Sequence, residues 1–348
     1  MWSVVRVVVL VVVLASPTRA QDVPSDVTFV LKRSWLDQLM SGGPNDRSVG
    51  ARWSVPLAMG EHSSVHGAAA DCELHVAAKL PGNRTLATPA GIVVEPPNVC
   101  KLRVPQLRTG GSVGARWTQY FDEHVTGKTC DVVGFPRIYS EHAAGGEAGS
   151  SNPDHVVEIH PAVTMSCDGD TVNFLPLLTV VPAMKKITEK SASACLDQRK
   201  LYVRLRGGAQ PRYEFLEEGA KGSGGRCGNF IVVDAHVSKD YIRALSNGND
   251  HVALARVWVG EDGPYPLKIY TYAGTEVDRQ IAAVLADPNE AATVELSLHG
   301  LLTYDYFTIV QKLQEDRGGG VFAWRDTIRD FEEVPHPLAL VVFGKALP

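Results

Sequence analysis

The chain has 348 residues, of which 45% are hydrophobic and 21% charged, and its 32 glycines and 21 prolines favour turns over long helices. The formal net charge is −5 at pH 7, and lysines and arginines cluster only in short pairs such as Lys185-Lys186. The composition indicates a globular protein, and the acidic charge argues against nucleic acid as a partner, because nucleic-acid binders usually show a basic footprint.

The N-terminus has the three parts of a secretory signal peptide. Residues 1–6 carry one positive charge, Val7–Ala15 are nine uninterrupted apolar residues, and Thr18 and Ala20 stand at the −3 and −1 positions of a cleavage site. This apolar run is too short to span a bilayer core, which needs about 20 residues. We therefore expect cleavage before Gln21. Removing residues 1–20 takes away two arginines and no acid, so the net charge moves from −5 to about −7.

No later apolar stretch is long enough to span a membrane, so the mature chain is expected to be secreted or periplasmic, without a transmembrane segment.

Residues 21–48 form an extension with one short helix at Ser34–Leu39.

Residues 49–190 read as a first β domain, in which short alternating runs are separated by Gly, Pro and Asn. The predicted elements, in chain order, are the strands 51–57, 73–80 and 91–95, a helix at 117–124, and the strands 129–139 and 155–167. Three strands, a helix and two strands is the element order of an OB-type barrel, a five-stranded Greek-key barrel. A β-sandwich can show a similar order.

Residues 191–348 read as a second β-rich domain with one or two short helices. A helix over 185–191 precedes it, and the predicted strands are 201–205, 229–234, 252–259, 267–272, 293–299 and 304–310. Thr275 and Asp278 resemble a capping box before a helix that contains Ile281 and Leu285. The fold class is thus mostly β, an OB-like five-stranded barrel followed by a second β-rich domain; a second barrel of the same type is a further interpretation.

The six cysteines are even in number and include no CxxC pair, which favours disulfides over a zinc site. If the strands 129–139 and 155–167 pair antiparallel, Cys130 lies opposite Cys167, at a Cα separation of about 4.5–5.5 Å that suits a disulfide. The predicted pairs are Cys72–Cys100, Cys130–Cys167 and, by elimination, Cys195–Cys227. The alternative is a set of free, buried cysteines.

Two E-x-H triplets are the candidate functional motifs, since the sequence has no G-x-S-x-G, H-E-x-x-H, Walker A or dinucleotide signature. Residues two apart on a strand share a face, so Glu73 lies on the same face as His75, and Glu158 on the same face as His160. If the two strands lie close together, these side chains converge into a ligand set that suits a divalent transition metal, with His142 and its neighbour Glu141 adding to it. The structural alternative is that these residues have no site function and form only the polar, solvent-facing side of half-exposed strands.

The segments Asp71-Cys-Glu-Leu-His75, Glu95-Pro-Pro-Asn-Val-Cys100, Val132-Val-Gly-Phe135 and Glu158-Ile-His-Pro161 follow one another in the chain. In this order they resemble a family of uncharacterised secreted bacterial proteins with the motifs D-x-D-x-H, E-x-P-x-x-x-C, V-x-G-F and E-[IL]-H-P. The resemblance covers residues 65–168. This sequence departs from it at Glu73, at Ala162 and in a longer loop after His142. The resemblance implies export and a β fold, but no reaction.

Two functions from different classes follow. The first is a non-catalytic binding or structural protein that presents loops and one barrel face to a partner of unknown kind. The second is a metal-assisted hydrolase of phosphodiesters or polysaccharides, with Glu158 or Glu73 as the base and histidines as metal ligands.

Overall fold

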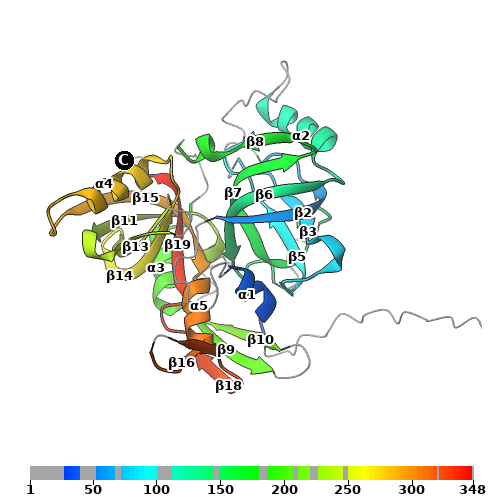
Figure 1. The fold of residues 1–348 in the computed structure, drawn as a ribbon. Helices are drawn as coiled ribbons and strands as arrows, with labels where there is room; N and C mark the ends of the chain where they lie inside the picture. Colours follow the sequence, from blue (N-terminus) through cyan, green and yellow to red (C-terminus); the bar gives the residue numbers. More distant parts are fainter. Residues whose placement is uncertain are drawn as a thin grey trace, which may run out of the picture.

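The computed structural model describes residues 27–39, 52–66, 72–99, 112–143, 149–179, 186–206, 211–219, 226–245, 250–319 and 321–346. The predicted signal peptide and its cleavage site lie outside these residues. Two β-barrels lie side by side, with a third sheet at one end of the pair (Figure 1). Among the described residues, no helix has the length and apolar character needed to cross a membrane.

The first barrel closes in the pairing order β2-β3-β5-β7-β6, and β6 returns to β2. Its strands are β2 (Trp53–His62), β3 (Val76–Lys79), β5 (Gly91–Val94), β6 (Thr129–Ile138) and β7 (His155–Cys167). All neighbours are antiparallel except the parallel pair β5 and β7, and helix α2 (Val113–His124) connects β5 to β6. This is the pairing of an OB-type barrel, as predicted. Strand β8 (Asp170–Asn173) extends the sheet beside β7.

The second barrel has the same connectivity, with the pairing order β11-β13-β14-β19-β15 closed by β15 on β11. Its strands are β11 (Ile231–Ser238), β13 (His251–Val259), β14 (Asp262–Thr271), β15 (Thr293–Tyr304) and β19 (Leu338–Lys345). The parallel pair is β14 with β19, and helix α4 (Glu276–Ala286) again connects the third strand to the fourth. Its N-cap is Thr275, whose side chain accepts from the Asp278 N–H as the sequence predicts.

The third sheet collects strands from distant parts of the chain, in the order β18-β9-β10-β1-β4. They are β1 (Phe29–Lys32), β4 (Ala87–Thr88), β9 (Lys200–Arg206), β10 (Arg212–Glu218) and β18 (Ile328–Glu333). The remaining elements are α1 (Arg33–Leu39), α3 (Glu189–Gln198), β12 (Ile242–Ala244), α5 (Tyr306–Leu313), β16 (Gln314–Asp316), β17 (Phe322–Trp324) and the 3₁₀ turns η1 (Pro81–Asn83), η2 (Leu175–Thr179), η3 (Arg226–Gly228) and η4 (Lys239–Tyr241).

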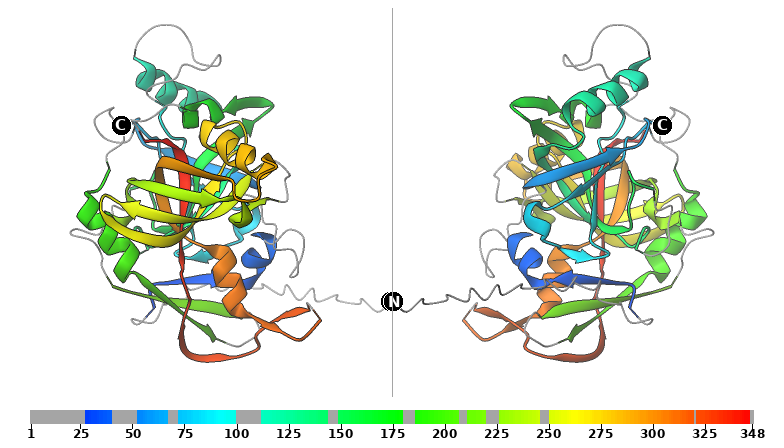
Figure 2. Two further views of the ribbon diagram at one scale, coloured as in Figure 1. Left: turned by 90° about the vertical axis from the view of Figure 1, so that its left-hand side faces the viewer. Right: turned by 90° about the vertical axis from the view of Figure 1, so that its right-hand side faces the viewer.

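One predicted element has the wrong type, and several others begin or end at different residues. The segment predicted as a strand at 304–310 is largely helix α5, which runs from the second barrel toward the β16–β17 hairpin (Figure 2). Asp305 caps its first turn, and Tyr306, Ile309 and Leu313 are buried on one face at helical spacing. Helix α3 begins at Glu189, later than predicted, and β3 begins at Val76 rather than at residue 73.

Two of the predicted disulfides are present. Cys130 and Cys167 are opposite each other in the β6–β7 ladder and bonded, with a Cα separation of 4.4 Å. Cys195 of α3 is bonded to Cys227, with a Cα separation of 5.8 Å. Both pairings are therefore confirmed. The third predicted pair, Cys72–Cys100, stays a prediction because Cys100 lies outside the described residues.

Candidate functional site

Six charged or titratable residues are buried together where the two barrels meet, and none of them is more than 5% exposed as a whole residue. We call this set the interbarrel cluster; its members are Glu73, Glu95, Arg137, His155, Glu158 and His160. They come from the outer face of the first barrel. On β7, Val157 and Ile159 belong to the hydrophobic core, so the alternation of a strand turns Glu158 and His160 outward.

Strand register explains how these residues meet. Arg137 on β6 is directly opposite Glu158 on β7. In the parallel pair, Val94 is level with Ile159, which places Glu95, the residue after β5, beside His160. The Glu95 N–H donates to the Ile159 carbonyl at 3.1 Å. The parallel pairing of β5 and β7 therefore brings together residues more than sixty positions apart.

His160 is the centre of the interbarrel cluster. Its Nε2 lies 2.9 Å from Oε1 of Glu73, and its Nδ1 lies 2.9 Å from Oε2 of Glu95 and 3.3 Å from Oε2 of Glu158. Both ring nitrogens thus donate to carboxylates, which is the pattern of a protonated imidazole. The rings of Phe230 and Phe343 from the second barrel stand edge-on to it, with centroids at 6.1 and 5.2 Å.

Arg137 connects the interbarrel cluster to the second barrel. Its Nη1 donates to Glu158 at 2.5 Å. Its Nε donates to the carbonyl of Leu302 and its Nη2 to that of Gly228, both at 2.9 Å. A single guanidinium therefore neutralises a carboxylate of the first barrel and satisfies the buried carbonyls of Leu302 on β15 and of Gly228 in η3. The Ile138 N–H, which donates to Thr303 Oγ1 at 3.1 Å, adds another bond across the interface.

Two of the cluster carboxylates, Glu95 and Glu158, have lowered pKa values. Burial by itself would raise the pKa of Glu95, but the imidazoles of His75 and His160 outweigh it and lower that pKa to about 2. Burial has the same tendency at Glu158, where the charge of Arg137 and two imidazole hydrogen bonds hold the pKa well below its ordinary range.

The two cluster histidines are protonated. His155 donates from Nδ1 to the Pro153 carbonyl at 2.6 Å and from Nε2 to Glu158 Oε1 at 3.2 Å. Burial would lower the pKa of both imidazoles, but their hydrogen-bonded and charged partners raise the pKa of His155 and hold that of His160 well above its ordinary value.

The predicted site residues fall into two groups. Glu73, Glu158 and His160 converge as expected. His75 lies at the edge of the cluster, with a 17% exposed side chain and its Nε2 3.8 Å from Glu95 Oε1. The ring of His142 stacks on that of His155, with centroids 4.9 Å apart, and does not reach the carboxylates. The neighbouring Glu141 is half-buried, and burial raises its pKa.

Sequence reasoning missed Glu95, Arg137 and His155 as site residues. Glu95 was visible only as the first residue of the E-x-P motif. Arg137 and His155 could have been found, because each lies among apolar residues of a clearly predicted strand. A charged residue that is buried in such a strand needs a partner of opposite charge or a hydrogen bond. Their common location depends on strand pairing, which the sequence left open.

Two groups of three residues place potential metal ligands close together: Glu73, Glu95 and His160, and Glu95, His155 and Glu158. Within each group, one nitrogen or oxygen from each residue lies within 4.8 Å of the others. Carboxylates and imidazoles are ligands for divalent transition metals. A histidine must offer a lone pair to bind a metal, however, and both nitrogens of each imidazole here face oxygen acceptors. Metal binding would therefore displace a proton and a hydrogen bond.

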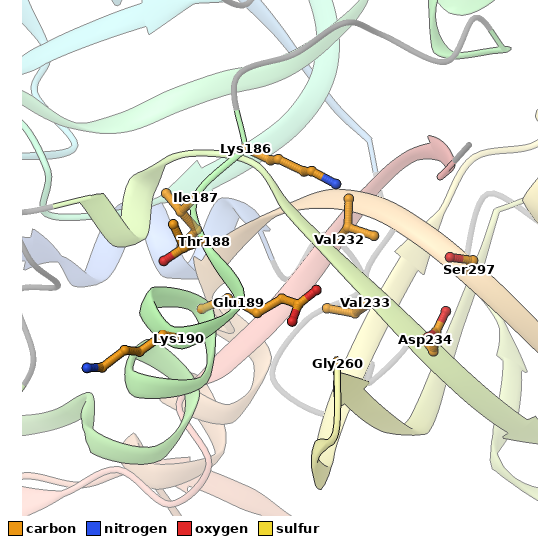
Figure 3. Close-up of a pocket in the computed structure, with 11 residues that line it drawn as sticks. Lys186, Ile187, Thr188, Glu189, Lys190, Val232, Val233, Asp234, Gly260 and Ser297 are labelled. Carbon is orange, nitrogen blue, oxygen red and sulfur yellow. The ribbon is translucent and has the colours of Figure 1, made fainter. Parts of the chain in front are cut away.

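A surface hollow of ≈ 490 Å³ lies elsewhere, between the start of α3 and the second barrel (Figure 3). Lys186 and Glu189 line it from one side, and Val232, Val233 and Asp234 of β11 from the other. Its lining includes both charge signs and no member of the interbarrel cluster.

Comparisons of the chain with family models, with curated proteins and with solved structures find no match.

Proposed function

We propose that this chain is an exported, non-catalytic binding protein in which the interbarrel cluster is a structural lock between two OB-type barrels. Paired barrels of this type offer a rigid support for ligand-binding strands and loops. Export is supported by the signal-like N-terminal sequence and by the two disulfides, which persist in oxidising compartments.

The observation that carries this proposal is the complete pairing of the interbarrel cluster. Each ring nitrogen of His155 and His160 faces an oxygen acceptor, and the Arg137 guanidinium donates to Glu158. A catalytic base needs contact with substrate, whereas these residues are buried and the His160 ring lies against Phe230 and Phe343. Burial and full pairing are what a structural ion network requires.

The test combines metal content with stability. The mature protein, purified from unsupplemented medium, is expected to hold far less than one equivalent of zinc or manganese. His160→Ala is expected to lower the free energy of unfolding by about 1–3 kcal/mol through lost buried hydrogen bonds. His236→Ala serves as the matched control, because that histidine lies on β11, away from the cluster, with a 23% exposed side chain. A His160 variant that is as stable as the control would contradict the structural lock.

The second candidate is a metal-assisted hydrolase of phosphodiesters or polysaccharides, and the two ligand groups that share Glu95 favour it. In that case near-stoichiometric metal would remain after purification and would be lost in His160→Ala. Hydrolysis would be lost together with the metal, while the metal-free wild-type protein and the variant would unfold alike.

A further inference from the structure

The surface hollow beside α3 is lined by charges of both signs. We call it the α3 hollow; Lys186 and Glu189 lie on one side of it, and Asp234 of β11 and Ser297 of β15 on the other (Figure 3). Asp234 is directly opposite Ser297 in the β11–β15 ladder, so their side chains lie next to each other on the outer face of the second barrel. Val232, two residues before Asp234, shares that face and adds an apolar surface.

The charged groups that face the α3 hollow are unpaired in the described part of the chain. Within those ranges, the side chains of Lys186, Glu189 and Asp234 form no ion pair and no hydrogen bond. Lys190, the other charged residue of the lining, extends away from the hollow (Figure 3). One ammonium and two carboxylates therefore face the same space without neutralising each other.

The Glu189 carboxylate has its place in the α3 hollow because residue 260 is a glycine. Gly260 lies in the turn between β13 and β14 at a φ of 59°, and a Cβ there would stand 2.6 Å from Oε2 of Glu189. Any other residue would need the left-handed conformation that glycine adopts without strain, and its side chain would displace the carboxylate. The turn thus leaves open the space from which Glu189 faces Asp234 and Ser297.

We propose that the α3 hollow binds a small zwitterion, a free α-amino acid with an apolar side chain. The ammonium group of such a ligand has three N–H donors, for which Glu189, Asp234 and Ser297 offer oxygen acceptors. Its carboxylate pairs with Lys186, and its side chain lies on Val232. The hollow, at ≈ 490 Å³, has the volume of a small-molecule site.

The charge pattern disfavours other classes of ligand. A simple anion would be repelled by Glu189 and Asp234, and a diamine would place its second positive charge beside Lys186. A metal ion is disfavoured as well, because the groups of potential metal ligands among the described residues include no residue of this hollow. A ligand that carries both charges on neighbouring groups matches both sides of the hollow.

The test is an NMR titration of the mature protein with L-leucine and with its two halves, isopentylamine and isocaproate. The wild type is expected to bind L-leucine about tenfold or more tightly than either half, because each half lacks one of the charged groups. The double variant Glu189→Gln with Asp234→Asn is expected to bind L-leucine about tenfold or more weakly. Lys186→Gln is expected to weaken the binding of L-leucine but not that of isopentylamine.

The matched control is Asp240→Asn with Glu290→Gln, which removes two exposed carboxylates of the second barrel that do not line the α3 hollow. It is expected to bind L-leucine like the wild type, and a melting curve of each variant confirms that it folds. No binding of L-leucine by the wild type, equally tight binding of isopentylamine, or equal binding of L-leucine by both double variants would overturn the proposal.

This proposal rests on the binding role proposed above but not on the interbarrel cluster. Its failure therefore leaves the metal and stability measurements to decide that role.

Discussion

Replacement of Arg137 by methionine tests the interbarrel cluster most directly. Methionine keeps much of the side-chain volume but removes the guanidinium that joins Glu158 to the carbonyls of Leu302 and Gly228. The variant would leave a buried carboxylate with one cation fewer and the carbonyls of Leu302 and Gly228 without their donor.

The expected cost follows from burial. The side chains of Arg137 and Glu158 are 2% and 3% exposed, so solvent screens their interaction little. Removing one partner of such a buried pair typically destabilises a protein by about 3–5 kcal/mol, because an uncompensated charge remains. Each carbonyl left without a donor would add about 1–3 kcal/mol if no water replaced the lost bond. We therefore expect Arg137→Met to lower the free energy of unfolding by at least about 3 kcal/mol.

The assay is equilibrium unfolding in urea near pH 6, with a double-mutant cycle that adds Glu158→Gln. Because Glu158→Gln removes the uncompensated charge, the double variant should lose less stability than the sum of the two single changes, by about 2 kcal/mol. The matched control is Arg325→Met, which breaks the Arg325–Glu332 pair, whose side chains are 22% and 34% exposed. That change should cost less than about 1 kcal/mol.

Equal costs for Arg137→Met and for the control would refute the reasoning. So would additive effects in the cycle, because they would mean that the guanidinium and the Glu158 carboxylate do not depend on each other.

Three further predictions concern pH, the disulfides and processing. The pKa of His160 is raised, so its contribution to the stability of the fold is complete below the ordinary imidazole pKa of 6.5 and is lost as pH rises. The pKa of Glu95 is lowered, so its contribution is complete above the ordinary carboxyl pKa of 4.5 and is lost as pH falls toward about 2. Urea unfolding across pH should therefore show maximal stability between about 4.5 and 6.5, and a maximum above pH 8 would contradict this. Replacing Cys130 and Cys167 by alanine should cost about 3–4 kcal/mol on the chain-entropy model, for a loop of this length, and non-reducing peptide mapping should recover the pair. N-terminal sequencing of the exported protein should begin at Gln21, and an intact Met1 would disprove cleavage.

Local features of this protein could be predicted from the sequence because neighbouring residues determine them. Alternation along β7 places Glu158 and His160 on one side, and the Thr275 cap marks the start of α4. Cysteines at the two ends of an expected hairpin indicated the Cys130–Cys167 pairing. Each of these depends on strand periodicity or on a single helical turn.

Helix α5 shows where local reasoning fails. Tyr304 to Val310 is rich in aromatic and β-branched residues, which favour strands. Burial of one helical face against the second barrel, together with the Asp305 cap, outweighs that preference.

The site itself was decided by the tertiary structure. Glu95 joins His160 only because β5 and β7 pair in parallel, a contact between segments far apart in the chain. Burial of the cluster depends on the second barrel, which supplies Phe230, Phe343 and the carbonyls that Arg137 satisfies. The sequence by itself determined that Glu158 and His160 share the face of β7 opposite Val157 and Ile159. Whether that polar face meets solvent or a second barrel depends on long-range packing, which no local pattern encodes.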